Sequence, residues 1–517
     1  MASLTTSAAI VIGVAIVLYL AMMVAIGAFK SKENKDIKDF YLGGRKLGPL
    51  VTAMSAEASD MSSWLLMGLP GVALITGLAE ASWTAIGLAI GTYVNWLIVA
   101  KRLRLYSERL GAVTIPEFFS RRFGDEKNIL SLIAAIIIII FFIPYTASGF
   151  AACGKLFSSL FGMNYLTAMI LSALVIVVYC TLGGFLAAST TDFIQSIVMT
   201  FALIAVLGIG EGIVGGFGAV FDNVKAFPGF LNVFQGGNVL TGEAGSYGAI
   251  PVVSTLAWGL GYFGMPHVLL RFMAINDPGK LKTSRRVASV WVVISMGIAV
   301  LIGIVGYSLM AKGIVPQYAD GSAAETIIVD VSRFLSTRGY VPAFAAGIFL
   351  SGILASTMST ADSQLIAASS SVTEDILVNV MGRKLSEKKL MIIARVSVIV
   401  ISVIAVFFAR NPGSSVFRIV SFAWAGFGAA FGPVMLFGLF WKRMNKWGAL
   451  AGMVGGGVMI FVWKFVIRKL GGAWDIYELL PAFIVACILI VVVSLATKKP
   501  DGKITHLFEK VQHDMHA

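Results

Sequence analysis

Apolar stretches long enough to cross a bilayer recur from one end of this 517-residue chain to the other. A membrane-spanning helix needs about 20 predominantly apolar residues, and windows of that length predict thirteen helices here. Only 13% of the residues are charged, against about 25% in a typical soluble domain. The sequence therefore predicts an all-α polytopic membrane protein. The expected helices span residues 7–29, 48–76, 80–101, 128–155, 163–185, 190–214, 247–273, 287–312, 339–372, 389–409, 413–441, 446–468 and 477–497.

Basic residues gather in alternate loops between these helices. Of the 40 Lys and Arg, 29 lie in residues 30–47, 101–127, 271–286, 383–389, 442–446 and the tail from Lys498. Cytoplasmic loops of membrane proteins carry such an excess of Lys and Arg. An odd helix count then puts the N-terminus outside and the C-terminus in the cytoplasm, in a multi-pass protein of the plasma membrane. This topology, with contact to anionic lipids of the bilayer, explains the net charge of +13, so no nucleic-acid partner is expected.

The sequence shows few signs of disulfide bonds, metal sites or enzyme motifs. Cys153, Cys180 and Cys487 are scattered through apolar segments, which fits reduced packing residues better than a disulfide framework or a metal site. The chain has no phosphate-binding Gly-rich loop with Lys, no HExxH and no GxSxG elbow in a strand–turn–helix context. The sequence therefore predicts neither an enzyme nor an ATP-driven pump.

One apolar segment, residues 48–76, contains a run of polar residues. Between Ser55 and Trp64 it places four serines and two acids, Glu57 and Asp60, at membrane depth. A carboxylate there costs several kcal/mol unless it is paired, hydrated or protonated. The run is typical of an ion or substrate path. The alternative is a polar residue that only holds helices together.

Two apolar segments are interrupted by glycine and proline. The first interruption is expected at Gly68–Gly71, and the second in the glycine-rich run from Trp258 to His267. Glycine and proline weaken a helix and free backbone groups. In a bilayer those groups persist only where they line a cavity or are buried in protein. Close helix packing at the glycines is the alternative interpretation.

The two interrupted segments lie five helices apart, so they cross the membrane in opposite directions. Broken helices in matching positions indicate an inverted repeat with a central transport site. The predicted divisions are residues 1–47, the first helix and a cytoplasmic loop; 48–214, the first repeat; 215–246, an extracellular loop; 247–441, the second repeat; 442–497, two further helices; and 498–517, a cytoplasmic tail.

Several uncommon motifs occur in the order found in a known family. They are Tyr41-Leu-Gly-Gly-Arg45, Ala58-Ser-Asp-Met-Ser-Ser-Trp64, Trp258-Gly-Leu-Gly-Tyr262, Met358-Ser-Thr360 and Phe422-Ala-Trp-Ala-Gly-Phe-Gly428. From Tyr41 to Lys499 the chain resembles the solute:sodium symporter family, and within it the bacterial sodium/proline symporters. The resemblance implies thirteen helices around a LeuT-type core, which is a five-helix inverted repeat. It also implies sodium-coupled import of L-proline by alternating access.

The resemblance implies a sodium site between the second and ninth predicted helices. Its expected ligands are the carbonyls of Ala58, Met61 and Ser356 and the hydroxyls of Ser359 and Thr360. Oxygen ligands suit sodium because it is a hard cation. Taken alone, the two hydroxyls also fit side chains that bond back to their own helix.

A second sodium site, present in some family members, is predicted from Asp192, Ser359, Asp362 and Ser363. The last three lie three or four residues apart, so they share about one helix face. The best-studied proline symporters have an uncharged residue where this chain has Asp362. A buried polar network or a helix-end cap is the alternative interpretation.

A pocket for a zwitterionic amino acid needs donors for the carboxylate, acceptors for the ammonium and a flat apolar surface for the ring. The two breaks and the resemblance assign this role to Asp60, Ser62, Ser63, Trp64, Tyr145, Trp258, Tyr262 and Pro266. For the aromatic residues, helix packing or an interfacial belt is the alternative.

Gating or coupling is expected of Arg45, Glu57 and Asp60, although Arg45 alone also fits one more basic loop residue. Burial disfavours an ionised carboxylate, so proton coupling at Asp60 stays open as an alternative to sodium. Glu57 and Ser63 stand where proline symporters usually have glycine. Another small amino acid or a betaine-like solute therefore also stays open, as do a transporter-derived sensor and a channel.

Overall fold

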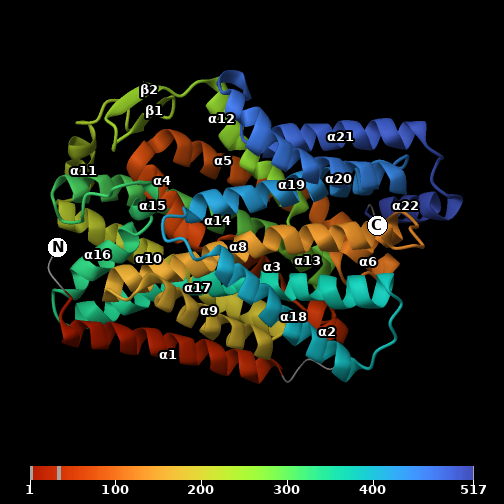
Figure 1. Cartoon of the computed structure of the whole chain (residues 1–517), viewed down its shortest axis with the longest axis horizontal. Coiled ribbons are helices and arrows are strands. Elements are labelled where there is room, and N and C mark those ends of the chain that lie inside the picture. Colours follow the sequence, from red (N-terminus) through yellow and green to blue (C-terminus); the bar gives the residue numbers. More distant parts are fainter. Residues whose placement is uncertain (1–3, 32–36, 516–517) are drawn as a thin grey trace.

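The computed structural model describes residues 4–31 and 37–515 as a bundle of helices that run mostly along one axis (Figure 1). Among the described residues, ten helices are long and apolar enough to cross a membrane, and one bent pair brings the number to eleven. Two shorter apolar helices, Tyr165–Thr181 and Ala249–Gly264, lie where two more crossings are expected. The predicted all-α membrane fold is confirmed, and the count of thirteen crossings stays a prediction.

The elements follow the chain in the predicted order. The first half of the chain contains α1 (Thr6–Ser31), α2 (Ile37–Leu42), α3 (Pro49–Asp60), α4 (Leu69–Thr76), α5 (Leu78–Val94), α6 (Ala100–Leu110), α7 (Ile115–Arg122), α8 (Ile129–Phe161), α9 (Tyr165–Leu182), α10 (Phe185–Val214), α11 (Phe217–Val224), β1 (Gln235–Asn238), β2 (Glu243–Ser246) and α12 (Ala249–Leu256). The second half contains α13 (Pro266–Ala274), α14 (Leu281–Ala311), α15 (Gly321–Ala324), α16 (Ile327–Ser336), α17 (Tyr340–Ser370), α18 (Glu387–Phe408), α19 (Val416–Phe440), α20 (Lys446–Val462), α21 (Leu479–Ala496) and α22 (Gly502–Asp514). Short 3-10 or π-helical pieces extend several of these helices, and those used below are η2 (Trp64–Gly68), η3 (Asn95–Val99), η4 (Ala257–Gly264) and η7 (Trp463–Ile467).

The centre of the bundle is built around α17. This helix packs against α1, α3, α8 and α10, and residues 349–371 are all buried. The outer faces of α1, α18 and α21 instead expose apolar side chains such as Val17, Val403 and Val492. Exposed apolar surface of this extent marks contact with a partner or a membrane, and on a helical bundle of this length it fits lipid.

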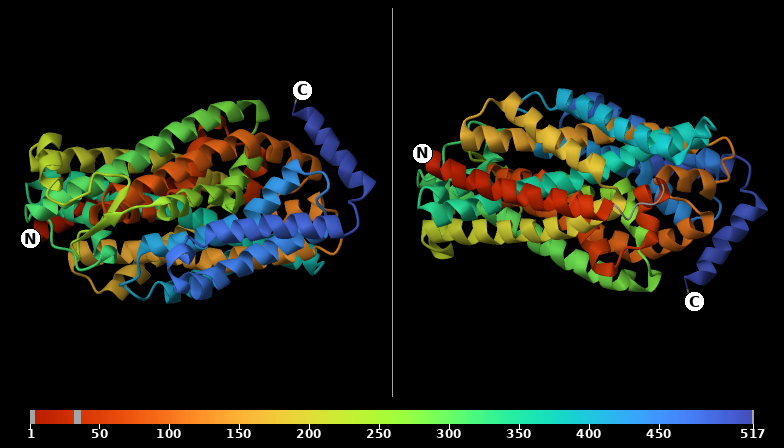
Figure 2. Two further views of the ribbon diagram at one scale, coloured as in Figure 1. Left: turned by 90° about the horizontal axis from the view of Figure 1, so that it is seen from above. Right: turned by 90° about the horizontal axis from the view of Figure 1, so that it is seen from below.

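The two ends of the bundle carry different elements (Figure 2). The start of α1, α11, the β1–β2 hairpin and α15 lie at one end, which we call the hairpin end. Helices α2, α6 and α22 lie at the other, which we call the tail end. The first and last described helices therefore reach opposite ends, as an odd number of crossings requires.

The break in the second apolar segment lies earlier than the glycine and proline pattern predicts, at the position that the sodium ligands implied by the resemblance require. The chain leaves the helix at Met61–Ser63, not at Gly68–Gly71. From Trp64 a wider π-helical turn leads into α4 without interruption. Pro70 lies in the first turn of α4, where proline is tolerated, so it does not break the chain there.

Two further sequence-based expectations are corrected. The sixth apolar helix, α10, begins at Phe185 rather than near residue 190. The expected loop 215–246 contains the short helix α11 and a hairpin in which Gln235 pairs with Ser246. Its four-residue strands are polar and largely exposed, so they leave no alternating apolar pattern in the sequence.

Candidate functional site

The site is centred on the break between α3 and α4. Helix α3 ends at Asp60, and Met61 leaves the helical conformation with φ −74° and ψ 67°. The helix resumes at Trp64 after a bend of 61°. A break at this depth frees backbone carbonyls that a bilayer cannot solvate, so they need a ligand or a protein partner.

Asp60 connects this break to two other parts of the bundle. Its side chain is fully buried, and its Oδ2 accepts a 2.6 Å hydrogen bond from the Tyr262 hydroxyl. Its backbone carbonyl accepts hydrogen bonds from the Tyr145 hydroxyl and from Trp64 Nε1, each at 3.1 Å. Its Oδ1 has no hydrogen-bond partner among the described residues. One carboxylate oxygen is therefore available to a ligand.

A second break faces the first. The 3-10 piece η4 ends in the extended residue Met265 (φ −74°, ψ 108°), and Pro266 opens α13. Trp424 Nε1 donates to the Trp258 carbonyl at 2.7 Å. A Cβ on Gly261 would lie 1.9 Å from that same indole nitrogen, so only glycine fits there. The expected interruption in residues 247–273 is therefore present and tightly packed.

Aromatic side chains line the space between the two breaks. The rings of Trp64 and Trp258 are 6.2 Å apart, and Tyr262 packs edge-on against Trp424 at 4.9 Å. The Ser63 hydroxyl is buried with no hydrogen-bond partner in the part of the chain that the structure describes. Hydrogen bonds and ring contacts thus connect Asp60, Trp64, Tyr145, Trp258 and Tyr262, while Ser62 and Ser63 form the turn beside them and Pro266 begins α13.

Three of the five predicted sodium ligands meet at one place. The Ser359 hydroxyl on α17 lies 2.7 Å from the Ala58 carbonyl on α3 and 3.2 Å from the Ser356 carbonyl. The Thr360 hydroxyl is buried without a partner among the described residues. The Ser356 hydroxyl instead bonds to Ile353 of its own helix, at 2.9 Å. Oxygen atoms of this kind suit a hard monovalent cation.

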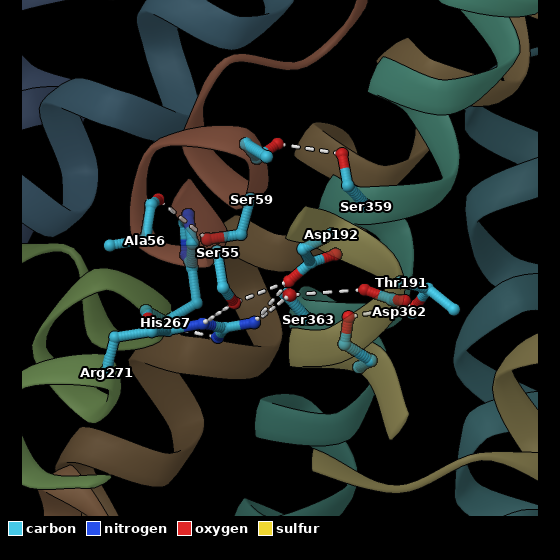
Figure 3. Close-up of polar contacts among 12 residues, drawn as sticks. Ser55, Ala56, Ser59, Thr191, Asp192, His267, Arg271, Ser359, Asp362 and Ser363 are labelled. Carbon is cyan, nitrogen blue, oxygen red and sulfur yellow. Dashed lines mark hydrogen bonds and ion pairs between the residues drawn. The ribbon is translucent and has the colours of Figure 1, made fainter. Parts of the chain in front are cut away.

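Arg271 is a site residue that the sequence analysis missed. It was counted among the basic loop residues 271–286, but it is only 1% exposed. Its Nη2 lies 3.1 Å from Asp192 Oδ2 and 2.5 Å from the Ser363 hydroxyl, and its Nε lies 3.0 Å from the Ser55 hydroxyl (Figure 3). The guanidinium therefore connects α3, α10 and α17 from its position on α13.

The residues predicted to form a second sodium site surround this guanidinium. Ser55 donates a 2.7 Å hydrogen bond to Asp192 Oδ2, and Ser363 donates to Asp362 Oδ1 at 3.1 Å. Asp192 and Ser363 contact Arg271 directly, whereas Ser359 turns toward Ala58. The structure thus brings Asp192, Asp362 and Ser363 together, with a protein cation among them.

Glu57, three residues before Asp60 on α3, contacts η3, the π-helical segment that follows α5. Its Oε1 accepts a 2.8 Å hydrogen bond from Trp96 Nε1 in η3, and its Oε2 has no hydrogen-bond partner among the described residues. Asn95, next to Trp96, donates a 3.0 Å hydrogen bond to the Tyr262 carbonyl. Both partners were missed because a Trp and an Asn in an apolar helix carry no distinctive spacing.

Arg45 lies at the tail end, away from the break. Its backbone is left-handed (φ 56°), as are Gly43 and Gly44 before it. Its guanidinium donates to the carbonyls of Met273 (2.5 Å) and Ala112 (2.8 Å). It therefore joins the turn before α3 to the end of α13, the helix that carries Arg271.

Comparison with known proteins places these features in a family. The model of the sodium:solute symporter family matches residues 40–456. The chain belongs to this family. The osmoregulated proline transporter OpuE of Bacillus subtilis is 42% identical over 494 residues, which cover 95% of this chain and 96% of OpuE. The sodium/proline symporter of Escherichia coli K12 is 41% identical over 500 residues, which cover 96% of both chains.

The fold of this symporter also has a solved relative. A Na⁺-coupled sialic acid symporter, solved in a substrate-bound outward-open state, matches with a TM-score of 0.77 over 95% of this chain and 99% of that chain. The two are 18% identical, so the match shows the fold alone, which is of the LeuT type. The expected family and fold are confirmed.

Proposed function

We propose that this sodium:solute symporter imports L-proline together with sodium by alternating access. Two relatives that are 41–42% identical are named for proline transport, which supports the choice of solute. The observation that carries the proposal is the position of Asp60. On one side it bonds to Tyr262 of the aromatic group between the two breaks, and two residues before it Ala58 contacts Ser359. The proposed cation site and the proposed solute site are therefore both built on the break between α3 and α4.

In this proposal sodium binds the carbonyls of Ala58, Met61 and Ser356 and the hydroxyls of Ser359 and Thr360. The contact between Ala58 and Ser359 supports it, since it already joins the broken helix to α17. A cation there would hold α3 and α17 together and fix the shape of the break. Solute binding then depends on sodium because the two sites share that backbone.

The solute would lie between the aromatic rings at the two breaks. The free Oδ1 of Asp60 and the buried Ser63 hydroxyl supply acceptors for its ammonium group. The Ser62 hydroxyl, which lies in the turn before η2 and accepts a hydrogen bond there, supplies a donor for its carboxylate. Trp64, Tyr145, Trp258 and Tyr262 supply flat apolar surface for a pyrrolidine ring.

One sodium ion supplies enough energy for concentrative uptake. A tenfold sodium gradient gives about 1.4 kcal/mol, and a membrane potential of about 100 mV gives about 2.3 kcal/mol. The sum of about 3.7 kcal/mol sustains a gradient of several hundredfold for a neutral solute at ideal coupling.

We further propose that the hairpin end faces outward and the tail end faces the cytoplasm of a cell with this protein in its plasma membrane. The concentration of Lys and Arg in the loops 30–47 and 101–127 and in the tail supports this orientation. The N-terminus then lies outside and the C-terminus inside, and the inverted repeats 48–214 and 247–441 flank the central site.

For the second predicted sodium site we propose a different occupant. The Arg271 guanidinium contacts Asp192 and Ser363, so a sodium ion bound among the same oxygens would have to displace it. We propose that Arg271 supplies the positive charge there and that one sodium ion accompanies each solute molecule.

A proton-coupled or differently selective symporter is the second candidate function. Glu57 favours it, because this buried carboxylate near Asp60 has one oxygen without a partner in the described chain. Such a group can carry a proton, and together with Ser63 it changes the polarity around the break. Another small amino acid or a betaine-like solute would then be the cargo.

Radiolabelled L-proline uptake into proteoliposomes tests the proposal. Inward gradients of sodium, potassium and protons are applied in turn. Saturable uptake driven by sodium alone is expected. Uptake driven by protons would support the second candidate and move the coupling chemistry to Asp60 and Glu57. No proline uptake under any gradient would contradict the proposed solute, and the same assay with other small amino acids and betaines would follow.

A further inference from the structure

The last helix, α22, lies across the tail end of the bundle (Figure 2, dark blue). Unlike the long helices, it does not run along the axis of the bundle. Phe508 and Val511 on its inner side are buried, whereas Lys503 and Lys510 are exposed. The helix is therefore docked on the ends of other helices by one apolar side.

Polar contacts join α22 to two separate parts of the tail end. Asp514 accepts a 2.5 Å hydrogen bond from Arg109 of α6. Lys101, also on α6, donates a 3.1 Å hydrogen bond to the backbone carbonyl just past the end of α22. Halfway along α22, Glu509 forms an ion pair with Lys442, in the turn that follows α19. Helix α22 thus ties the end of α6 to the end of α19.

Beneath α22 lies a buried arginine whose charge has no counter-charge. Arg122 on α7 is 1% exposed, its Nε donates to the Gly438 carbonyl at 2.8 Å, and its two Nη atoms have no partner among the described residues. Its guanidinium carbon lies 5.0–5.2 Å from the ring centres of Tyr106, Phe123 and Phe508. Contact with three rings stabilises the cation in part. Phe508 nevertheless covers a charge that water would otherwise solvate, and this opposes the docking of α22.

The docking of α22 is therefore a balance of opposing contributions. Burial of Phe508 and Val511 favours it, as do the ion pairs. In the pair of Lys442 and Glu509 the side chains are 49% and 56% exposed. Exposed ion pairs are weak, and dissolved salt screens them further. A rise in ionic strength consequently weakens the interactions that keep α22 docked.

The helix that α22 holds in place leads directly to the central site. Helices α5, η3 and α6 form one continuous helix, Leu78–Leu110. Its middle part, η3, bonds to α3 before the first break and to η4 before the second. Its far end contacts the end of α19 through a hydrogen bond from Arg102 to the Leu439 carbonyl at 2.7 Å. Helix α22 adds a second connection between the same two helix ends.

We propose that α22 is a strap that restrains the opening of the tail end, and that high ionic strength at that end releases it. This rests on the proposed function, because alternating access requires the tail end to open for the release of sodium and solute. While α22 is docked, the ends of α6 and α19 are held together. When salt screens its ion pairs, α22 detaches, water reaches Arg122, and the open state becomes more populated. The symporter then works faster.

Sodium-driven uptake of radiolabelled L-proline tests this inference. The full chain is reconstituted with the tail end inside proteoliposomes that contain about 0.1 or about 0.6 M potassium chloride, and external sucrose balances the osmotic pressure. The initial rate of the wild type is expected to be about threefold higher at the high luminal salt concentration. An equal osmolarity of sucrose in the lumen is expected to leave the rate unchanged.

Charge reversals identify α22 as the cause of this salt dependence. Glu509→Lys and Lys442→Glu each replace the ion pair by a repulsion, so both variants are expected to be fast at either salt concentration. The double variant Lys442→Glu/Glu509→Lys restores an ion pair with the charges exchanged. It is expected to regain the slow rate at low salt and the salt dependence of the wild type.

The matched control is Glu126→Lys, which makes the same change of charge at the tail end. Glu126 is exposed, and no ion pair of its side chain is found among the described residues, so wild-type behaviour is expected. Proline uptake that does not respond to luminal salt in the wild type, or that responds equally in Glu509→Lys, would overturn the strap and leave the proposed function standing. So would slow uptake in both single variants and the double variant, because α22 would then only stabilise the fold. No proline uptake by the wild type at either salt concentration would overturn both proposals.

Discussion

Asp60 and Asp192 are both fully buried carboxylates within the bundle, but their negative charges are balanced in different ways. Asp192 lies 3.1 Å from the guanidinium of Arg271 and accepts a further hydrogen bond from Ser55. Asp60 has a neutral partner, Tyr262, in place of a guanidinium, and each of the two carboxylates leaves one oxygen without a partner among the described residues. A buried charge needs a counter-charge. For Asp192 the counter-charge is a side chain of the protein, whereas Asp60 depends on a reversibly bound ligand.

This difference separates a transport site from a structural one. A carboxylate balanced by a fixed arginine holds helices in place, because the pair is costly to separate in a low dielectric. When the counter-charge is instead a mobile cation, the free energy of the buried carboxylate depends on whether that cation is bound. The Asp60 region is therefore expected to respond to sodium and solute, and the Asp192 region to govern stability. Four substitutions test this difference.

The largest effect is expected from Arg271→Gln. Removing the guanidinium leaves Asp192 buried and unpaired, which costs about 3–5 kcal/mol of stability. Thermal unfolding of the purified protein measures it. Arg271→Gln/Asp192→Asn removes both charges and is expected to recover part of the loss. Unchanged stability in the single variant would show that the arginine does not hold the helices together.

Asp60→Asn is expected to reduce sodium-dependent uptake about 100-fold, equivalent to about 2.7 kcal/mol, with little change in thermal stability. The amide keeps the hydrogen bond to Tyr262 but loses the charge that favours a cation. Uptake into proteoliposomes measures the effect, with the exposed Asp222→Asn as control. Normal sodium activation in Asp60→Asn would show that the charge of Asp60 is not needed for sodium coupling.

Ser359→Ala is expected to raise the sodium concentration for half-maximal uptake about tenfold, or about 1.4 kcal/mol. The physical reason is the loss of one hydroxyl ligand beside the Ala58 carbonyl. Ser356→Ala is the matched control, because its hydroxyl bonds to its own helix and only its carbonyl faces the site. Equal effects of the two substitutions would contradict the proposed ligand set.

The smallest effect is expected from Asp362→Ser. The Asp362 side chain bonds to Ser363, whose hydroxyl in turn contacts Arg271. Its loss is expected to change the sodium dependence of uptake by less than about threefold. A large rightward shift in the sodium titration would instead identify Asp362 as a sodium ligand and return a second ion to the site.

Much of the fold follows from the sequence because the bilayer imposes one length and one polarity on every crossing. The span expected for α17 matches the observed helix to within two residues, those expected for α8 and α14 are each six residues short at one end, and the family motifs lead to Asp60 and Ser359. The position of the first break does not follow as simply. Glycine and proline at Gly68–Gly71 are compatible with a π-helical turn, whereas the actual break at Met61–Ser63 is stabilised by tertiary bonds to Tyr145 and Tyr262.

The burial of Arg271 could not be predicted from the sequence. A charge near the end of an apolar segment is normally placed in a loop, because hydropathy measures only local polarity. The buried guanidinium of Arg271 is stabilised by hydrogen bonds to oxygens of Ser55, Asp192 and Ser363, which are far apart in the sequence. Only the packing of α3, α10, α13 and α17 brings them to one place.

The most direct test of the contrast is equilibrium binding of radioactive sodium to the purified protein. We expect about one ion per chain in the wild type, none in Asp60→Asn and an unchanged ion in Asp362→Ser, because Arg271 already supplies a cation beside Asp192. Two bound ions in the wild type, one of them lost in Asp362→Ser, would contradict it and show that sodium, not Arg271, balances the second group of carboxylates.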